Sequence, residues 1–482
     1  MSPSQAVELT AEVEAAPSGP KVGAFFDFDG TLISGYSARA FVEDRLRRRQ
    51  VPPLEVLRGV GAALDMALRG GDVTGLMRVT ARSSRGQPEE ELIALGQRLW
   101  RGRIAGMAYP EARALVQAHQ RRGHTVVLAS SATPYQVGPF AADLGIDHVL
   151  CTRFEVADGH MTGELDGPVL WGEGKAAAVR SFAAAHGVDL AESFGYANGD
   201  EDIAFLEAVG NPRPLNPAPR LAKAAEERGW PVRRFRRRDG VDLPALARTG
   251  AAVVGLTASA GAALAVGLLN RSRRDAANFA ASAGTDLTLA LAGVRLSVVG
   301  EEHLWSRRPA IFVFNHQSSL DVLIIGNLLR RDVTGVAKAE AAGDPRFAVF
   351  GALAGVAYVD RSDTAQAVSA LDQVLQRLRE GVSIAIAPEG TRSATATLGP
   401  FKKGAFHMAM QAGVPVVPIV IRNAGELMWR GSMLVRPGTI DVAVLPPVDT
   451  AGWRREDLDD HVEEVRRQFL AILDDWPAPA GS

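Results

Sequence analysis

Phe312-Val-Phe-Asn315-His316-Gln-Ser-Ser-Leu-Asp321 joins an apolar run to a polar turn and a helix start. The apolar run at 311–314 is typical of a buried strand, and Ser318 or Ser319 can cap the following helix. With His316 in the turn and Asp321 in the first helical turn, the carboxylate can hold one imidazole nitrogen while the other takes a proton from an alcohol. The stretch predicts an activated acceptor hydroxyl; taken alone, it also fits a satisfied core histidine.

The composition indicates a globular chain of two or three domains. Its 482 residues are 47% apolar and 22% charged, and its formal net charge of −2 gives no nucleic-acid signal. The single cysteine, Cys151, excludes an intramolecular disulfide and suits a reducing cytosol. No secretory signal is recognisable, and residues 1–20 are expected to form a disordered tail.

A second informative stretch lies near the N-terminus. An apolar strand at 22–26 runs directly into Asp27-Phe28-Asp29-Gly30-Thr31. Open α/β sheets place ligands at the carboxyl ends of their strands. There Asp27 can attack phosphorus and Asp29 can protonate the leaving group, and carboxylates at this density also hold Mg²⁺.

Residues 21–235 resemble the haloacid dehalogenase superfamily of phosphatases, in the branch that includes phosphoserine phosphatase. The resemblance implies that Asp27 is the nucleophile and Asp29 the acid/base. It assigns Ser130 to binding of the phosphoryl oxygen and Lys175 to balancing the charges of phosphate and nucleophile. It also implies a helical cap, which excludes water and selects the substrate.

The last motif of this family departs from its usual pattern. Asp202 matches the second of two aspartates, but Asn198 stands four residues earlier, where a Mg²⁺-binding carboxylate is usual. The implied Mg²⁺ ligands are Asp27, Asp29, Asn198 and Asp202, with Asp200 as a nearby substitute. An amide oxygen can bind Mg²⁺ but lacks the charge. Two interpretations stay open: a Mg²⁺-dependent phosphatase, or a catalytically weak domain with a regulatory or scaffolding role.

The middle of the chain carries a membrane signal. A basic run at 233–238 precedes the stretch 249–270, which has no charged residue and is long enough to span a hydrocarbon core. A second helix is expected from about 276 to 296, interrupted by Asp286. We favour a membrane-inserted hairpin or interfacial anchor whose arginines face anionic lipid, over a buried soluble helix pair.

Residues 290–450 alternate between strand and helix patterns. Strands are expected at 311–314, 383–387, 416–421 and 442–445, and helices at 321–330, 364–379, 403–412 and 456–473. Two loops at strand ends deliver Arg361 and Arg392, whose guanidinium groups suit a phosphate monoester. Thr391 can add a donor, whereas Glu389 is expected to order the arginines or bind a glycerol hydroxyl.

These blocks, together with Val414-Pro-Val-Val-Pro418, resemble the glycerolipid acyltransferase family, over about residues 250–450. That family includes the 1-acylglycerol-3-phosphate acyltransferases. The resemblance implies that His316 is the catalytic base and Asp321 its partner. It implies acyl transfer from acyl-coenzyme A, or from acyl carrier protein, to lysophosphatidic acid. The residues predicted to bind substrate are Asn315, Arg361, Glu389, Gly390, Thr391, Arg392 and Lys402.

The sequence therefore predicts an α/β protein with two α/β domains. A Rossmann-like phosphatase domain at 21–240, with a helical cap at about 36–103, precedes linker and membrane-associating helices at 241–296 and an acyltransferase domain at 297–482. The expected location is the cytoplasmic face of the cell membrane. Membrane lipids are the expected partners, nucleic acid is not, and self-association into a homodimer is left open.

Overall fold

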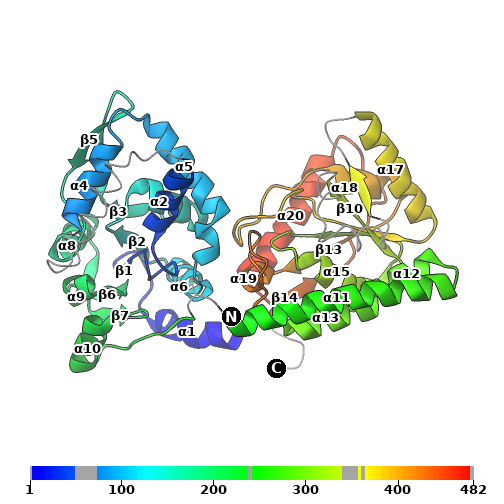
Figure 1. Ribbon diagram of the computed structural model, residues 1–482, viewed down its shortest axis with the longest axis horizontal. Helices are drawn as coiled ribbons and strands as arrows, with labels where there is room; N and C mark the ends of the chain where they lie inside the picture. Colours follow the sequence, from blue (N-terminus) through cyan, green and yellow to red (C-terminus); the bar gives the residue numbers. More distant parts are fainter. Residues whose placement is uncertain are drawn as a thin grey trace. The chain divides into compact units, whose positions relative to one another are not determined.

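The computed structural model describes residues 3–48, 73–236, 238, 242–338, 356–359 and 364–477 (Figure 1). The chain forms two compact units, Met1–Val241 and Asp242–Ser482. Each unit has its own sheet with helices packed against it, which confirms the predicted α/β class with two α/β domains.

The sheet of the first unit has five parallel strands in the order β3-β2-β1-β6-β7. The central strand β1 (Val22–Phe26) pairs with β2 (Thr125–Ser130) and β6 (Asp189–Ala197), and the edges are β3 (His148–Cys151) and β7 (Asn211–Pro214). All of β1 is buried because helices cover both faces of the sheet. Its carboxyl end consequently delivers the next residues, Asp27 to Thr31, to an edge of the core.

The helices of this unit serve either the sheet or the cap. Those that pack against the sheet are α6 (Pro110–Arg121), α7 (Pro134–Leu144), α8 (Glu173–His186), α9 (Ile203–Glu207) and α10 (Pro219–Arg228). In the stretch expected to form the cap, the described residues form α2 (Ser37–Arg47), α4 (Thr74–Ser83) and α5 (Glu89–Gly102), while 49–72 lie outside the described residues. A hairpin of β4 (Arg153–Ala157) and β5 (His160–Asp166) packs against α4.

The N-terminal residues differ from the expected disordered tail, because they contain helix α1 (Pro3–Ala15). Val13 is buried in the core, and the Glu12 carboxylate accepts a hydrogen bond of 3.0 Å from Arg213 Nε. His124 Nε2 also lies 2.7 Å from the Pro17 carbonyl oxygen. A polar segment with few large apolar residues is thus ordered by contacts with residues about one hundred or more positions away.

A buried chain of hydrogen bonds lies behind that contact. His119 Nδ1 is 2.8 Å from His124 Nδ1, and His119 Nε2 is 2.9 Å from the Tyr196 hydroxyl. Because the Pro17 carbonyl can only accept, His124 Nε2 carries a hydrogen, and in the neutral ring Nδ1 must accept from His119. Burial lowers the pKa of both histidines and so favours neutral rings, in which His119 Nδ1 donates to His124 and His119 Nε2 accepts from the Tyr196 hydroxyl.

The sheet of the second unit has seven strands in the order β11-β10-β12-β9-β13-β14-β8. They are β8 (Val294–Val299), β9 (Ile311–Phe314), β10 (Val333–Lys338), β11 (Ala357–Val359), β12 (Ser383–Ile386), β13 (Val416–Ile421) and β14 (Gly438–Val444). All neighbours are parallel except β13 and β14. The central strand β9 alternates its side chains between two cores, with Phe312 and Phe314 on one face and Ile311 and Val313 on the other.

The helices of this unit lie on both faces of its sheet. One core is covered by α13 (Thr285–Ala292), α15 (Asp321–Leu329) and the short α19 (Ala424–Leu427); the other by α17 (Thr364–Arg379), α18 (Gly404–Ala412) and α20 (Leu458–Asp474). Helix α12 (Arg273–Phe279) and the π-helical turn η3 (Ala280–Gly284) lead into α13, and α14 (His303–Ser306) precedes β9. The helix expected to reach residue 296 ends earlier, since Gly293 has a left-handed φ of 71° and β8 then pairs with β14.

Helix α11 (Leu243–Leu269) carries the apolar stretch predicted from the sequence (Figure 1). Small residues face α13: a Cβ on Gly255 would lie 2.5 Å from Leu291, and Ala252 and Ser259 are buried. Leu268 and Leu269 point outward and are 79% and 83% exposed. By length and composition, α11 is the one helix in the described part of the chain that could cross a membrane, with a mean hydropathy of 2.0 over its best 18 residues.

Candidate active sites

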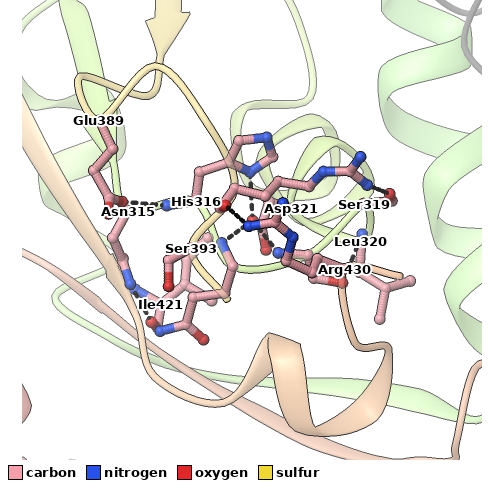
Figure 2. A network of polar contacts seen from close by, with 12 residues as sticks. Asn315, His316, Ser319, Leu320, Asp321, Glu389, Ser393, Ile421 and Arg430 are labelled. Atoms are coloured by element: carbon pink, nitrogen blue, oxygen red, sulfur yellow. Dashed lines mark hydrogen bonds and ion pairs between the residues drawn. The ribbon is translucent and has the colours of Figure 1, made fainter. Parts of the chain in front are cut away.

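The carboxyl end of β9 holds an imidazole–carboxylate pair. His316 Nδ1 lies 2.7 Å from Asp321 Oδ2 (Figure 2). Asp321 is fully buried at the first residue of α15, whereas 22% of the His316 side chain is exposed. Because an ionised carboxylate can only accept, Nδ1 carries the hydrogen and Nε2 carries the lone pair. The spacing of these residues thus yields the geometry of a general base.

Backbone amides hold the same carboxylate oxygen. Gln317 N and Ser318 N each donate to Asp321 Oδ2 at 2.8 Å, so this oxygen accepts three hydrogen bonds. The expected serine cap is replaced by a local turn in which Ser318 Oγ accepts from Leu320 N at 3.1 Å. Asp321 also lies at the helix N-terminus, where a negative charge is favourable. Three donors and the start of α15 thus fix the position of Oδ2, the oxygen that faces His316.

The loop after β12 holds the backbone of His316 from both sides. Glu389 Oε1 accepts from His316 N at 2.8 Å, and its Oε2 accepts from Gly399 N at 2.9 Å. Ser393 N donates to His316 O at 2.7 Å. Burial raises the pKa of Glu389 although both amide bonds oppose the shift. The glutamate therefore contacts backbone amides, where the sequence suggested an arginine or a glycerol hydroxyl.

The predicted phosphate-binding residues lie next to this turn. The Arg392 guanidinium donates to Ser319 Oγ, which places it beside His316 and Asp321. Gly390 bends the loop, and Thr391 is exposed on it. Arg361 lies outside the described residues.

Asn315 and Lys402, also predicted to bind substrate, do not belong to the turn that holds Arg392. The buried Asn315 amide pairs with the backbone of Ile421, donating to its oxygen and accepting from its nitrogen, both at 2.7 Å. It ties the end of β9 to the end of β13. Lys402 donates its backbone N–H to Pro388 O at 2.9 Å, and its side chain is exposed. The Asn315 side chain thus joins two strands, while the Lys402 backbone is bonded to the loop after β12.

In the first unit, the end of β1 holds a buried charged cluster. Lys175 Nζ lies 2.9 Å from Asp27 Oδ1 and 2.6 Å from Asp202 Oδ1. Burial alone would lower the pKa of Lys175, but the two carboxylates outweigh it and raise that pKa. Ser130 is buried at the end of the neighbouring strand, with its Oγ accepting from Ala132 N at 3.2 Å. The structure thus gathers Asp27, Lys175 and Asp202 as the motifs predicted.

Asp29 faces the cap side of the same site. Its carboxylate accepts from Ser37 N at 2.7 Å and from Ser37 Oγ at 3.1 Å, and Gln136 Nε2 donates to Ser37 Oγ at 2.9 Å. Burial raises the pKa of Asp29 to about 7, against the effect of the Ser37 hydrogen bonds. A carboxyl group that titrates near neutrality suits proton transfer to a leaving group.

Asn198 lies beside the first aspartate of the motif. Thr31 Oγ1 is 2.9 Å from Asn198 Oδ1 and 3.2 Å from Asp27 Oδ2, so both oxygens point toward one hydroxyl. Gly30 has φ 80°, and a Cβ there would lie 2.3 Å from Asn198 Nδ2, so this turn requires glycine. Asp200 does not take the missing carboxylate's place, because its Oδ1 accepts from Leu221 N at 2.8 Å.

Two family models match the chain at these two sites. The haloacid dehalogenase-like hydrolase model matches residues 24–207, and the acyltransferase model matches residues 295–422. A protein of Mycobacterium tuberculosis named as a probable phosphatase is 33% identical over 259 residues, which are 52% of this chain and 90% of that one. A 1-acyl-sn-glycerol-3-phosphate acyltransferase of Limnanthes alba is 34% identical over 198 residues, 41% of this chain and 69% of that one.

The chain belongs to both families. It joins a haloacid dehalogenase-like domain to an acyltransferase domain. The sheep 1-acyl-sn-glycerol-3-phosphate acyltransferase alpha is 38% identical over 186 residues, 38% of this chain, and the match spans 64% of that protein's length.

The haloacid dehalogenase-like domain offers an incomplete site for Mg²⁺. Asp27 Oδ2 and Asn198 Oδ1 are the two side-chain oxygens that converge, and one of them is neutral. Both oxygens of Asp202 are engaged, by Lys175 Nζ at 2.6 Å and by Gly199 N at 3.3 Å, and Asp29 is turned toward Ser37. Across the described ranges, no three His, Cys, Asp or Glu side chains are grouped to hold a metal. The predicted ligand set therefore does not assemble around one point.

Another arginine, which the motifs did not reveal, contacts the predicted site of the acyltransferase domain. Arg430 Nη1 donates to the Arg392 carbonyl oxygen at 2.8 Å, and Figure 2 shows Arg430 beside the turn from His316 to Asp321. The sequence carried no usable signal for it, since it lies 38 residues after Arg392 and outside every recognised block.

Proposed function

We propose that the acyltransferase domain acylates 1-acyl-sn-glycerol 3-phosphate to phosphatidic acid in phospholipid biosynthesis, with acyl-coenzyme A as the donor. The observation that carries this proposal is the 2.7 Å contact between His316 Nδ1 and Asp321 Oδ2, with Arg392 beside it. The names of the sheep and Limnanthes alba relatives support the same acceptor.

The reaction begins at His316. Its Nε2 takes the proton of the free glycerol hydroxyl as the oxygen forms a bond to the thioester carbonyl carbon. The carbon–sulfur bond then breaks, and the proton on Nε2 passes to the sulfur of coenzyme A. Asp321 keeps the hydrogen on Nδ1 and stabilises the imidazolium that forms between the two proton transfers.

The acceptor phosphate is bound by the loop after β12. Arg392 provides paired N–H donors, and Thr391 and Gly390 add a hydroxyl and backbone amides. Arg361 and Lys402 are proposed as further cations for the acceptor phosphate or coenzyme A. Glu389 acts by fixing the His316 backbone, through its 2.8 Å bond from His316 N.

We place the enzyme on the cytoplasmic face of the cell membrane, associated through α11. Its exposed leucines and the neighbouring Arg271, Arg273 and Arg274 suit apolar acyl chains and anionic lipid headgroups. Acyl carrier protein is the alternative donor partner.

For the haloacid dehalogenase-like domain, we propose hydrolysis of a phosphoric monoester. Asp27 forms a bond to phosphorus as the ester oxygen leaves, Asp29 protonates that oxygen, and water then releases the phosphate. Mg²⁺ dependence is expected of such a domain. The second candidate, a catalytically weak domain with a regulatory or scaffolding role, is favoured by Asn198 and by the engagement of Asp202 with Lys175.

The two activities are tested on one full-length protein. Radiolabelled acyl transfer from acyl-coenzyme A to lysophosphatidic acid, and phosphate release from a panel of esters with Mg²⁺, are compared for wild type, His316→Ala and Asp27→Asn. His316→Ala should lose about 10²- to 10⁴-fold in acyl transfer only, and Asp27→Asn should lose phosphate release only. Near-normal acyl transfer by His316→Ala would overturn the first proposal; equal phosphate release by wild type and Asp27→Asn would favour the weak domain.

A further inference from the structure

The segment Met428–Ser432, which follows α19, fastens two loops of the acyltransferase site together. Ser318 Oγ donates to Met428 O at 2.6 Å, which ties the segment to the His316 turn. Trp429 Nε1 donates to Ala394 O at 3.1 Å, which ties it to the loop after β12. The segment thus lies against the general base and against the loop that carries Arg392.

Arg430 of this segment contacts the backbone of Arg392 itself. Arg430 Nη1 donates to the Arg392 carbonyl oxygen at 2.8 Å, while the Arg392 guanidinium donates to the Ser319 hydroxyl. The side-chain partner of Arg392 is therefore a neutral hydroxyl. Two carboxylates of the same site, Asp321 and Glu389, are buried and bonded to backbone amides.

This arrangement concentrates positive charge where an anion would bind. The Arg430 guanidinium donates to the main-chain carbonyl of Arg392, so the site loop that carries one guanidinium is bonded to a second. A rigid guanidinium fork also fixes the loop more firmly than an ammonium, which is a point charge on a flexible stem.

We propose that Arg430 is the positioning residue that holds Arg392 for the acceptor phosphate and so makes the site prefer phosphate-bearing lysolipids. This inference rests on the proposed function, and it deepens that proposal by assigning acceptor preference to a residue outside the family blocks. Arg430 acts through Arg392, because it donates to the carbonyl oxygen of that residue.

The experiment measures binding and turnover separately in full-length protein in mixed micelles. Binding of fluorescent lysophosphatidic acid and fluorescent monoacylglycerol is measured without acyl donor for wild type, Arg430→Ala, Arg430→Lys, Arg392→Ala and the double variant. Arg295→Ala, at an exposed position on β8, is the matched control.

We expect Arg430→Ala to weaken lysophosphatidic acid binding about tenfold and monoacylglycerol binding less than twofold, with kcat within about threefold of wild type. Arg430→Lys should restore part of the loss. In the Arg392→Ala background, the second substitution should add less than twofold, because residues that act as one unit are not additive. Arg295→Ala should change neither measurement.

Equal weakening for both lipids, or full additivity of the two arginine substitutions, would overturn the role of Arg430. Absence of acyl transfer by wild type would instead overturn the proposed function. The binding comparison without donor still decides the role of Arg430 in that case.

Discussion

Replacing Asp321 by Asn tests whether the carboxylate sets the state of His316. The substitution keeps the side-chain volume and removes the charge. Asp321 Oδ2 accepts from His316 Nδ1, Gln317 N and Ser318 N at 2.7–2.8 Å, and an amide oxygen can keep the two backbone bonds. What is lost is the negative charge next to the imidazolium that forms during the reaction.

The size of the effect follows from this geometry. A hydrogen bond to a charged group is worth about 1.5–3 kcal/mol, and about 1.4 kcal/mol is a factor of ten in rate, so the lost charge alone predicts a fall in kcat of about 10- to 150-fold. If the amide turns its NH₂ toward Nδ1, the hydrogen moves to Nε2 and the base is lost, so that the fall approaches about 10⁴-fold.

Asp321→Ala separates this effect from folding. It leaves two buried N–H groups, of Gln317 and Ser318, without their acceptor, at a cost of about 1–3 kcal/mol each, whereas Asn keeps them bonded. We therefore expect both variants to lose kcat, measured as radiolabelled acyl transfer at saturating donor, and Ala to lose clearly more stability in urea unfolding. Acyl transfer by Asp321→Asn within about threefold of wild type would refute the reasoning.

The remaining predictions concern stability, metal and backbone support. His119 and His124 should make the free energy of unfolding of the N-terminal unit fall as the pH drops from 7 to 5.5. Burial lowers the pKa of both, so below about pH 6.5 the unfolded chain binds protons that the folded chain does not, at a cost of at most about 1.4 kcal/mol per pH unit for each histidine. Asp29, whose pKa burial raises to about 7, acts in the opposite direction, so the histidine contribution is the difference between wild type and variant. Urea midpoints measured against pH should show less loss of stability on acidification in His119→Gln than in wild type, and the same loss in the exposed control His160→Gln. Asn198→Asp should tighten Mg²⁺ binding at least about tenfold, because it adds a charged oxygen next to Asp27. Calorimetry measures this affinity. An unchanged affinity would show that residue 198 does not contact the ion. Glu389→Gln should lower kcat about 10- to 100-fold with little change in acceptor KM, because one amide group cannot accept from both His316 N and Gly399 N; a rise in KM alone would contradict this role.

Two kinds of contact could be predicted from the sequence. One joins residues that are close in sequence, and the other joins residues of motifs that a known family shares. His316 and Asp321 are five residues apart, so the turn and the helix start between them set their distance. Asp27 and Lys175 are 148 residues apart, and Lys175 lies in the first turn of α8, so only the resemblance to the family, and no local pattern, suggested that both belong to one site.

The contacts that could not be predicted join segments with no shared motif. Glu389 reads as a candidate for substrate binding, but its partners are the amides of His316, 73 residues away, and of Gly399. A local sequence pattern does not predict which distant N–H groups will donate hydrogen bonds to a buried carboxylate. The sequence pattern predicts helix at the start of β8 because its apolar residues continue the α13 pattern, and only the pairing with β14 selects the extended form.

The two sites stabilise their buried carboxylates in different ways, and this difference separates their chemistry. In the acyltransferase domain, neutral backbone amides hold Asp321 and Glu389, so the charge of Arg392 remains available for an anionic acceptor. In the haloacid dehalogenase-like domain, the charge of Lys175 is already shared between Asp27 and Asp202. A phosphate that enters there meets a cluster in which carboxylates outnumber the ammonium group, and Asn198 contributes an oxygen without helping to recruit a cation. We therefore expect the haloacid dehalogenase-like domain to need an external positive charge to bind a phosphate, whereas in the acyltransferase domain Arg392 is proposed to supply that charge.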